Sequence, residues 1–245
     1  MRRLELIGVD GIPEVVAGDD LGQLIAARAG LEAGDIVVVA QKVVSKAEGR
    51  TRDLSTVTAS DEAIRLAPHL VAEPDPRFVQ VVLDESVRIL RTERVLITQT
   101  HHGYVCANSG IDQSNIPGSE VVTLLPVDPD ASAEQLRARL REITGVTAGV
   151  IVSDTFGRPW RLGIVNVALG VAGMPALVDM RGRKDDAGRE LHATVLAVAD
   201  EVAAAAGLVM GKTSRTPVVI VRGVDLQGNG SGRELIRPAA EDLFR

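Results

Sequence analysis

The sequence is poor in the residues that build disulfides and nucleic-acid surfaces. It has one cysteine, Cys106, and its aromatic residues are one tryptophan, one tyrosine and three phenylalanines among 245 residues. A single cysteine excludes a disulfide within the chain. Few rings for base stacking, together with a formal net charge of −6, argue against a nucleic-acid partner. An anionic ligand therefore has to be met by a local group of cations.

Long apolar runs are also missing. The longest, residues 202–210, is about half the length that a membrane-spanning helix needs. At the start of the chain, "MRRLELIGVDGIPE", Glu5 and Asp10 interrupt the apolar residues before a signal-peptide core can form. These absences predict a cytoplasmic protein without membrane contact.

The remaining composition favours one globular domain. Apolar residues make up 45% of the chain, which is enough for a substantial core. No repeat, linker or low-complexity segment divides residues 1–245, so we treat them as one domain. We expect helices in 17–30, 75–91, 132–145 and 188–207, and strands in 36–39, 94–100, 103–110, 149–154 and 216–223. This irregular alternation favours an α+β fold, or an irregular α/β fold, with a mixed sheet and irregular strand order.

Particular residues bound these elements. An Asp cap and Gly30 delimit the first helix, while Ser132 caps and Gly145 stops the third. The strand at 149–154 should end at Asp154. Glycine-rich connections are expected at 102–119, 155–163 and 223–233, and loops of that length often position ligands.

The segment "GLVMGKT", residues 207–213, is one residue short of the phosphate-binding loop GxxxxGK[ST]. That loop needs a preceding strand and a following helix, so that backbone N–H groups and the helix dipole meet the phosphates. Here Ala206 stands at the first glycine position, and a predicted helix precedes a predicted strand. We therefore expect a helix C-terminus with a glycine cap, and no P-loop.

Two acidic loop segments have the composition of a site for a hard cation. "CANSGIDQSN" places Asp112, Ser114 and Asn115 after a strand-like run, and "VIVSDTFGRPWRLG" places Asp154 and Thr155 after another. Carboxylates beside a hydroxyl suit Mg²⁺ or Mn²⁺, and phosphoryl transfer uses such ions together with Lys or Arg. Taken singly, each acid is better explained as a turn residue that bonds its own backbone, because such residues are common in loops.

Other reactive residue types are expected to be structural. His101 and His102 lack the spacing of zinc ligands, and Cys106 lies in an apolar run typical of a buried thiol. Trp160 is expected to pack its loop onto the core.

Taken together, these segments resemble the coenzyme F420-0:L-glutamate ligase family, the γ-glutamyl ligases. The matching stretches follow the family's order and span almost the whole chain. They are "GIPEVVAGDDL", "GDIVVVAQKVVSKAEGR", "ANSGIDQSN", "VSDTFGRPWRLG", "ALGVAG", "ELHATVLAVADEVAAAAGLVMGK" and "TPVVIVRG". In longer bacterial relatives this module is followed by a flavin-binding, nitroreductase-like domain, so the chain resembles either a stand-alone enzyme or that N-terminal module.

The resemblance implies an enzyme that uses GTP and Mg²⁺ or Mn²⁺, with K⁺ as a candidate additional ion. It would attach L-glutamate to the lactyl carboxylate of coenzyme F420-0 and then add a second glutamate through a γ-linkage. It also implies an intertwined two-fold homodimer. By similarity, Asp112 and Asp154 are the catalytic acids and bind metal with Thr155. The positions matching the family's nucleotide contacts are Ile12, Pro13, Glu14, Val15, Gln41, Lys46, Asn115, Met210, Gly211 and Lys212.

The chain departs from the family's pattern at two of these positions. Many relatives carry serine at the position of Gln41. Archaeal relatives often carry an acidic or amide metal ligand where this chain has Lys212, which as a lysine could instead meet phosphate.

The implied chemistry agrees with the residues that the chain offers. Transfer of the GTP γ-phosphoryl group to a carboxylate gives an acyl phosphate, which the glutamate amine attacks. Both steps need positioning and charge neutralisation and no covalent protein nucleophile. Candidates for holding the F420-0 phosphodiester or the glutamate carboxylates are Arg158, Arg161, Arg181 and Lys184, although each taken alone is better explained as a solvated surface charge.

Two rival functions stay open at this point. Asp112 and Asp154 could activate water in a metal-dependent phosphohydrolase. Alternatively, the chain could be a non-catalytic sensor that changes shape on binding guanine nucleotide.

Overall fold

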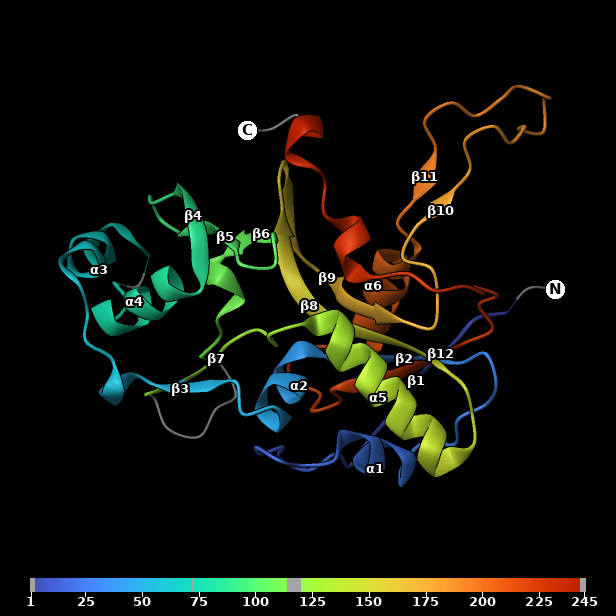
Figure 1. Cartoon of the computed structure of the whole chain (residues 1–245), viewed down its shortest axis with the longest axis horizontal. Coiled ribbons are helices and arrows are strands. Elements are labelled where there is room, and N and C mark those ends of the chain that lie inside the picture. Colours follow the sequence, from blue (N-terminus) through green and yellow to red (C-terminus); the bar gives the residue numbers. More distant parts are fainter. Residues whose placement is uncertain (1–2, 72, 114–119, 243–245) are drawn as a thin grey trace.

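A computed structural model describes residues 3–71, 73–113 and 120–242 (Figure 1). Its main sheet has the strand order β1-β12-β2-β8-β9. Strands β2 and β8 run parallel, and every other neighbouring pair is antiparallel. The strands are β1 (Glu5–Gly8), β12 (Val218–Arg222), β2 (Ile36–Ala40), β8 (Gly149–Arg158) and β9 (Arg161–Ala172). The predicted α+β class with a mixed, irregularly ordered sheet is confirmed.

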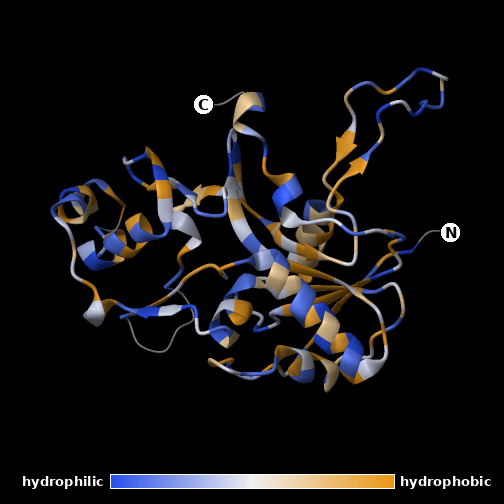
Figure 2. Ribbon diagram, in the orientation of Figure 1, coloured by the Kyte–Doolittle hydropathy of each residue, from blue (hydrophilic) through white to orange (hydrophobic). Residues whose placement is uncertain are grey.

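Helices cover both faces of this sheet. On one face, α1 (Leu21–Ala26) and α5 (Pro129–Thr144) share a core cluster with Val37 and Val39. On the other face, α6 (Val198–Met210) packs with Val38. Because successive side chains of a strand point to opposite faces, both faces of β2 are apolar, as its β-branched run predicts. In Figure 2 the central strands of the sheet are mostly orange, whereas the outer part of the β8–β9 hairpin is white to blue.

Described residues 51–123 form a second unit, here called the small lobe; the remaining described residues form the sheet lobe. The small lobe has its own core cluster, which includes Leu54, Phe78 and Leu96. Its elements are β3 (Thr51–Asp53), η1 (Leu54–Thr56), α3 (Asp61–Leu66), η2 (Ala67–His69), α4 (Pro76–Asp84), β4 (Ser86–Arg91), β5 (Ile97–Thr100), β6 (Val105–Ala107), η3 (Asn108–Gly110) and β7 (Val121–Thr123). Strands β4, β5 and β6 form one antiparallel sheet, and β3 pairs with β7.

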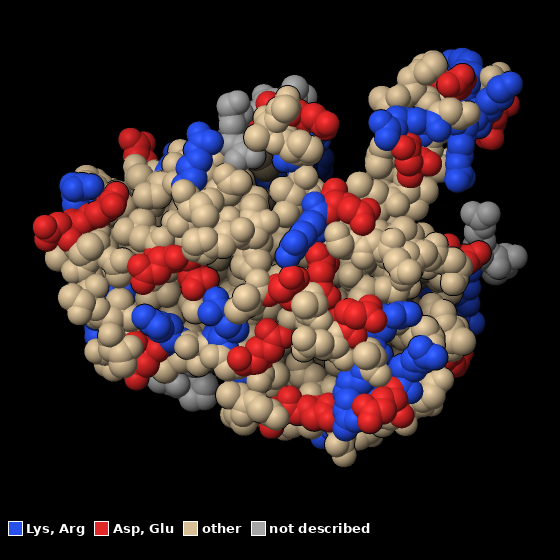
Figure 3. All heavy atoms as spheres, viewed as in Figure 1, with Lys and Arg blue, Asp and Glu red and all other residues tan. Residues whose placement is uncertain are grey.

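Two hairpins extend from the sheet lobe. Strands β8 and β9 pair over almost their whole length and turn at residues 158–161. The second hairpin, here called the arm, comprises residues 178–196 with β10 (Val178–Asp179) and β11 (Val195–Leu196) at its base. The arm projects from the body in Figure 1, and Figure 3 shows both signs of charge on it.

The remaining elements connect these parts of the molecule. Helix α2 (Gln41–Ala47) follows β2 directly, and two short helices, η4 (Gly232–Leu235) and η5 (Ala239–Glu241), lie near the end of the described chain. Within the described ranges, no helix combines the length and apolar character needed to cross a membrane.

Several predicted boundaries are confirmed. Asp20 caps α1, and Gly145 ends α5 in the left-handed conformation with φ of 72°. Strands β5 and β6 pair, and β12 lies within 216–223. The continuous apolar strands and the glycine cap could be predicted from sequence because each is determined by the residues of its own segment.

The helix predictions at 75–91 and 188–207 are wrong in half of their length. Helix α4 ends at Asp84, and Ser86–Arg91 forms a strand against β5. Helix α6 starts only at Val198, because the preceding residues return through the arm to pair with β10. In both places the conformation is decided by pairing with another strand, which the hydrophobic pattern of the segment itself does not reveal.

Four smaller predictions also need correction. The first helix ends at Ala26, before Gly30, and the cap of α5 is Asp128, not Ser132, because Pro129 opens the helix. Strand β8 does not end at Asp154 but runs to Arg158, so 155–163 is a hairpin rather than a loop. Trp160 is 87% exposed at the turn of this hairpin and does not pack onto the core.

Candidate functional site

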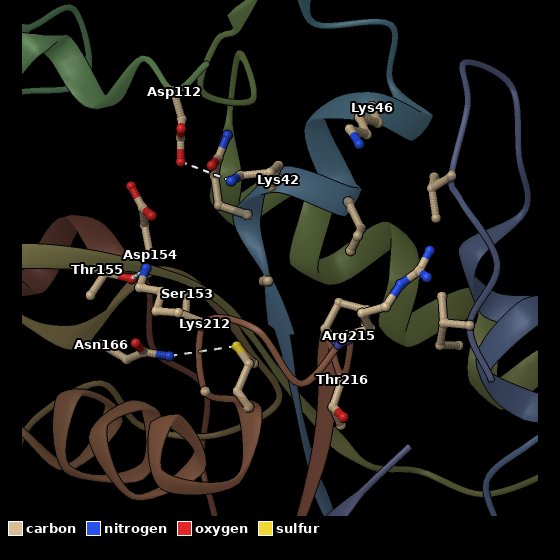
Figure 4. Close-up of a pocket in the computed structure, with 18 of the residues that line it drawn as sticks. Lys42, Lys46, Asp112, Ser153, Asp154, Thr155, Asn166, Lys212, Arg215 and Thr216 are labelled. Atoms are coloured by element: carbon tan, nitrogen blue, oxygen red, sulfur yellow. Dashed lines mark hydrogen bonds and ion pairs between the residues drawn. The ribbon is translucent and has the colours of Figure 1, made fainter. Parts of the chain in front are cut away.

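A cavity of about 620 Å³ opens at the carboxyl ends of the parallel strands β2 and β8. Ligands of open α/β sheets commonly bind at this edge, where the chain leaves each strand. Beyond β2 the chain enters α2, and Asp154 is the first residue of β8 past the last β2 pair, Ala40 with Ser153. The remaining walls are the N-terminal segment 12–15, Asp112 of the small lobe and the segment 210–217 after α6 (Figure 4).

Helix α2 supplies two lysines to the cavity wall. Lys42 and Lys46 are four residues apart, so they project from adjacent turns of one helix face. Lys42 Nζ lies 2.8 Å from Asp112 Oδ2, and Lys46 forms an ion pair with Glu14 of the N-terminal segment. Each lysine therefore joins α2 to a different wall of the cavity.

Gln41 connects α2 to the segment that follows the small lobe. Its buried side chain donates from Nε2 to Leu124 O at 3.0 Å and to Ser45 Oγ at 2.6 Å. Arg50 Nε also donates to Leu125 O, at 2.9 Å. These bonds hold the chain segment after Asp112 against the sheet lobe.

Asp112 and Asp154 point toward one another across the cavity (Figure 4). The pKa of Asp154 is raised to about 6, chiefly by desolvation of its carboxyl group and in smaller part by the charge of Asp112. The Thr155 N–H, Lys212 and Lys42 act in the opposite direction. Two carboxylates so placed disfavour each other's charge, and a cation between them would relieve that repulsion.

Lys212 and Thr155 meet on the Asp154 side of the cavity. The Lys212 ammonium donates to Thr155 Oγ1. Asn166 lies opposite Thr155 in the β8–β9 ladder and donates from Nδ2 to Met210 Sδ at 3.6 Å. The C-terminus of α6 is thereby attached to the strands that carry the acids.

The segment "GLVMGKT" is not a P-loop, as the sequence order predicts. Gly207 and Met210 belong to the last turns of α6, and β12 follows the segment. Gly211 caps the helix with φ of 56°, a backbone conformation that favours glycine. The helix thus presents its C-terminal end to the cavity, and Lys212 offsets the partial negative charge there.

The donor set fits a hard divalent cation. Asp112 offers carboxylate oxygens from the small lobe, and Asp154 and Thr155 offer carboxylate and hydroxyl oxygens from β8 across the cavity. Among the described residues there is no group of three or more His, Cys, Asp or Glu that could hold a metal by itself. Mg²⁺ is typically bound by one or two carboxylates together with phosphate oxygens of a substrate, and these residues match that pattern.

The structure brings nearly all of the sequence-predicted site residues to this one cavity. Its lining includes Ile12, Pro13, Glu14, Val15, Gln41, Lys46, Asp112, Asp154, Thr155, Met210, Gly211 and Lys212. Asn115, with Ser114, lies outside the described residues.

Sequence reasoning missed Lys42, Ser153, Asn166 and Arg215, which also line the cavity. The lysine spacing in "QKVVSK" was the one available signal for Lys42. Asn166 could be recognised only after β9 was paired with β8 in the observed register.

The other predicted anion-binding cations do not line the cavity. These are Arg158, Arg161, Arg181 and Lys184. Arg158 donates to Leu162 O within the hairpin turn, and Arg181 pairs with Asp179 at 2.6 Å on the arm.

The histidines and the cysteine have structural contacts. His101 Nε2 lies 3.1 Å from Asp84 O, and His102 Nε2 lies 2.8 Å from Pro126 O. Burial raises the pKa of the Cys106 thiol to about 12, so it remains protonated and unreactive at neutral pH.

Comparisons with known proteins identify the family of this chain. The model of the F420-0:Gamma-glutamyl ligase family matches residues 11–223. A protein of Methanocaldococcus jannaschii named coenzyme F420:L-glutamate ligase is 46% identical, over 100% of this chain and 98% of its own length. Proteins of the same name from Archaeoglobus fulgidus and Methanothermobacter thermautotrophicus are each 45% identical; the alignments cover 99% of this chain and 97% and 99% of theirs.

Proposed function

The chain belongs to the F420-0:gamma-glutamyl ligase family, and from this premise we propose that it joins L-glutamate to coenzyme F420-0 at the expense of GTP. A further glutamate is then added through a γ-linkage. The reaction would take place in the cytoplasm, where GTP and glutamate are available.

One observation carries the proposal: two carboxylates from different lobes point into a cavity that also holds three lysines (Figure 4). The lysines are Lys42, Lys46 and Lys212. A chain with net charge −6 repels a triphosphate as a whole, so local cations are needed to bind one. A cavity of about 620 Å³ is within the range of nucleotide-sized ligand sites.

Asp112, Asp154 and Thr155 would hold Mg²⁺ or Mn²⁺, with K⁺ as a candidate additional ion. When bound, a divalent ion neutralises charge on the phosphates and orients them for in-line transfer. The segment Ile12–Val15, Gln41 and the residues 210–212 would line the nucleotide, and Lys46 would face its phosphates.

The acceptor carboxylate of F420-0 attacks the γ-phosphorus of GTP, and the bond from that phosphorus to the β-phosphate oxygen breaks. GDP leaves, and an acyl phosphate remains. The amine of glutamate then attacks the acyl carbon, loses a proton and expels inorganic phosphate, forming an amide. Lysine ammonium groups lower the barrier by neutralising charge that grows on the phosphate oxygens.

We also propose that the chain forms a two-fold homodimer. The turn of the β8–β9 hairpin exposes Trp160, Leu162 and Ile164, whose relative exposures are 87%, 99% and 59%. Clustered apolar side chains on a projecting hairpin are typical of an interaction surface. Sedimentation velocity of Leu162→Asp tests this: a monomeric variant supports the dimer, whereas a wild-type chain that sediments as a monomer contradicts it.

The function is tested by incubating the protein with F420-0, GTP, Mn²⁺ and isotopically labelled glutamate. Mass spectrometry of the deazaflavin product should show one and then two added glutamates, with one GDP released for each. ATP in place of GTP serves as the nucleotide control.

The same assay separates the rival functions. GDP release that ignores both F420-0 and glutamate would indicate a phosphohydrolase. Nucleotide binding without any product over several turnovers would indicate a sensor. Either result contradicts the ligase proposal.

A further inference from the structure

Three consecutive residues of η3 adopt left-handed backbone conformations two positions before Asp112, with the extended Ile111 between them and the acid. Asn108, Ser109 and Gly110 have φ of 50°, 53° and 70°. Glycine adopts this region freely and asparagine tolerates it, but serine does so rarely. Runs of left-handed residues are unfavourable for L-amino acids, so this turn needs support from its surroundings.

Two buried hydroxyl groups supply that support. The Ser109 N–H donates to Thr98 Oγ1 at 3.0 Å, and the two hydroxyl oxygens lie 2.8 Å apart. Ser109 Oγ also lies 3.0 Å from Val82 O, which can only accept. The Ser109 hydroxyl therefore donates to Val82 O, and the Thr98 hydroxyl donates to Ser109 Oγ. This closed set of bonds attaches the turn to β5 and α4 at once.

The turn leads directly to Asp112. Its last bond runs from Ile111 N to Asn108 O at 2.9 Å. Asp112 then exchanges two backbone hydrogen bonds with Thr123, at 3.2 and 2.9 Å. Asp112 is thus held between the left-handed turn on one side and β7 on the other.

We propose that Thr98 and Ser109 are positioning residues that set where the Asp112 carboxylate enters the cavity, an inference that rests on the proposed function. Neither residue lines the cavity, and both are nearly inaccessible to solvent, at 0% and 1% exposure. They act through the backbone: loss of their bonds lets the turn relax toward right-handed conformations and moves Asp112 away from Asp154.

The test compares Thr98→Val with a matched control on the same strand. Thr98→Val keeps the side-chain shape and removes the hydroxyl. Thr100→Val makes the same change two residues along β5, at a buried hydroxyl that has no hydrogen-bond partner among the described residues. Mn²⁺ affinity is measured in the presence of GTP from the electron paramagnetic resonance of free Mn²⁺, without turnover. Hydrogen exchange of residues 108–112 is measured on the same samples.

We expect Thr98→Val to weaken Mn²⁺ binding about 10-fold, as loss of outer hydrogen bonds around metal sites commonly does. Exchange in residues 108–112 should become faster. Thr98→Ser, which restores the hydroxyl, should bind as wild type does, and Thr100→Val should not differ from wild type. If Thr98→Val does not fold, Ser109→Ala serves in its place, because it leaves Thr98 able to accept the Ser109 N–H.

The outcomes separate this inference from the proposed function. Wild-type protein that binds no Mn²⁺ with GTP contradicts the proposed function, and the positioning role with it. Wild-type protein that binds Mn²⁺ while Thr98→Val binds equally well overturns the positioning role alone. An equal loss in Thr98→Val and Thr100→Val also overturns it, because the effect would then be general loosening of the small lobe.

Discussion

The sheet lobe and the small lobe hold their site acids in different ways. Asp154 lies on β8, a strand whose inner residues are buried between helices on both faces of the sheet. Asp112 follows a short strand and a left-handed turn in a lobe with its own core cluster. The position of Asp154 is therefore tied to global folding, whereas that of Asp112 depends on local hydrogen bonds and on the contacts between lobes.

The largest effect is expected from Asp154→Asn, which removes the acid on the sheet-lobe side. Product formation should fall about 10³-fold, the upper end of the loss seen when one charge-stabilising group is removed from an active site. Because burial already disfavours the charged carboxylate, the neutral amide should leave the fold intact. Mass spectrometry of the product measures the loss of activity, and circular dichroism checks that the variant is folded. A folded variant with wild-type turnover would exclude a role for Asp154 in the reaction.

The next effect concerns the stability of the small lobe. Leu96→Ala should cost about 2 to 5 kcal/mol, because Leu96 is fully buried in that lobe's cluster. Native-state hydrogen exchange should show faster opening in β4, β5 and β6 and unchanged protection in β2 and β8. Leu140→Ala, the matched change in the sheet-lobe core, should instead lower protection throughout. Equal effects of the two variants on both lobes would show that the lobes unfold as one unit.

Acid should destabilise the sheet lobe through Asp35. This buried carboxylate accepts two hydrogen bonds from Arg222, each of 2.8 Å, and one from Glu32 N. Burial acts to raise the pKa of Asp35, but these bonds outweigh it and the pKa is lowered from 3.8. The stabilisation is therefore complete above the unfolded pKa and is lost as pH falls through the lower folded pKa.

Thermal unfolding at pH 7 and pH 3 tests the Asp35 pair. Asp35→Asn should lower the melting temperature by a few degrees at pH 7, and the difference from wild type should shrink at pH 3. A difference that is the same at both pH values would contradict the role given to the charge.

The smallest effect is expected from Lys46→Ala, at the cavity wall. Loss of one ammonium group near the phosphates should weaken GTP binding about 10-fold, which isothermal titration calorimetry measures directly. Lys184→Ala removes the same charge from the arm, away from the cavity, and should leave GTP affinity unchanged. Equal affinities of wild type and Lys46→Ala would exclude Lys46 from phosphate binding.

Prediction from sequence succeeded where the residues themselves hold the information. The β-branched run of β2, the cap at Gly145 and the order of elements around "GLVMGKT" are local features, and each was predicted correctly. Predictions failed at β4, at the β8–β9 hairpin and at the arm. There the backbone hydrogen bonds are made with a strand that no local pattern identifies.

The site shows the same division. The residue types for a metal and a triphosphate could be read along the chain, and the resemblance to the ligase family assigned them to one task. Lys42 and Asn166 could be assigned to the site only from the folded structure. Lys42 is placed there by its ion pair with Asp112, and Asn166 by the register of β8 and β9.

The amino-acid sequence by itself determined the chemistry that this protein can offer: oxygen donors, lysines and a core able to hold them. Only the tertiary structure decided that Asp112 and Asp154, far apart in the chain, face one cavity. Side-chain chemistry is a property of each residue, but the distance between two acids is set by packing between lobes and by strand register. Both of these arise from contacts between residues remote in sequence.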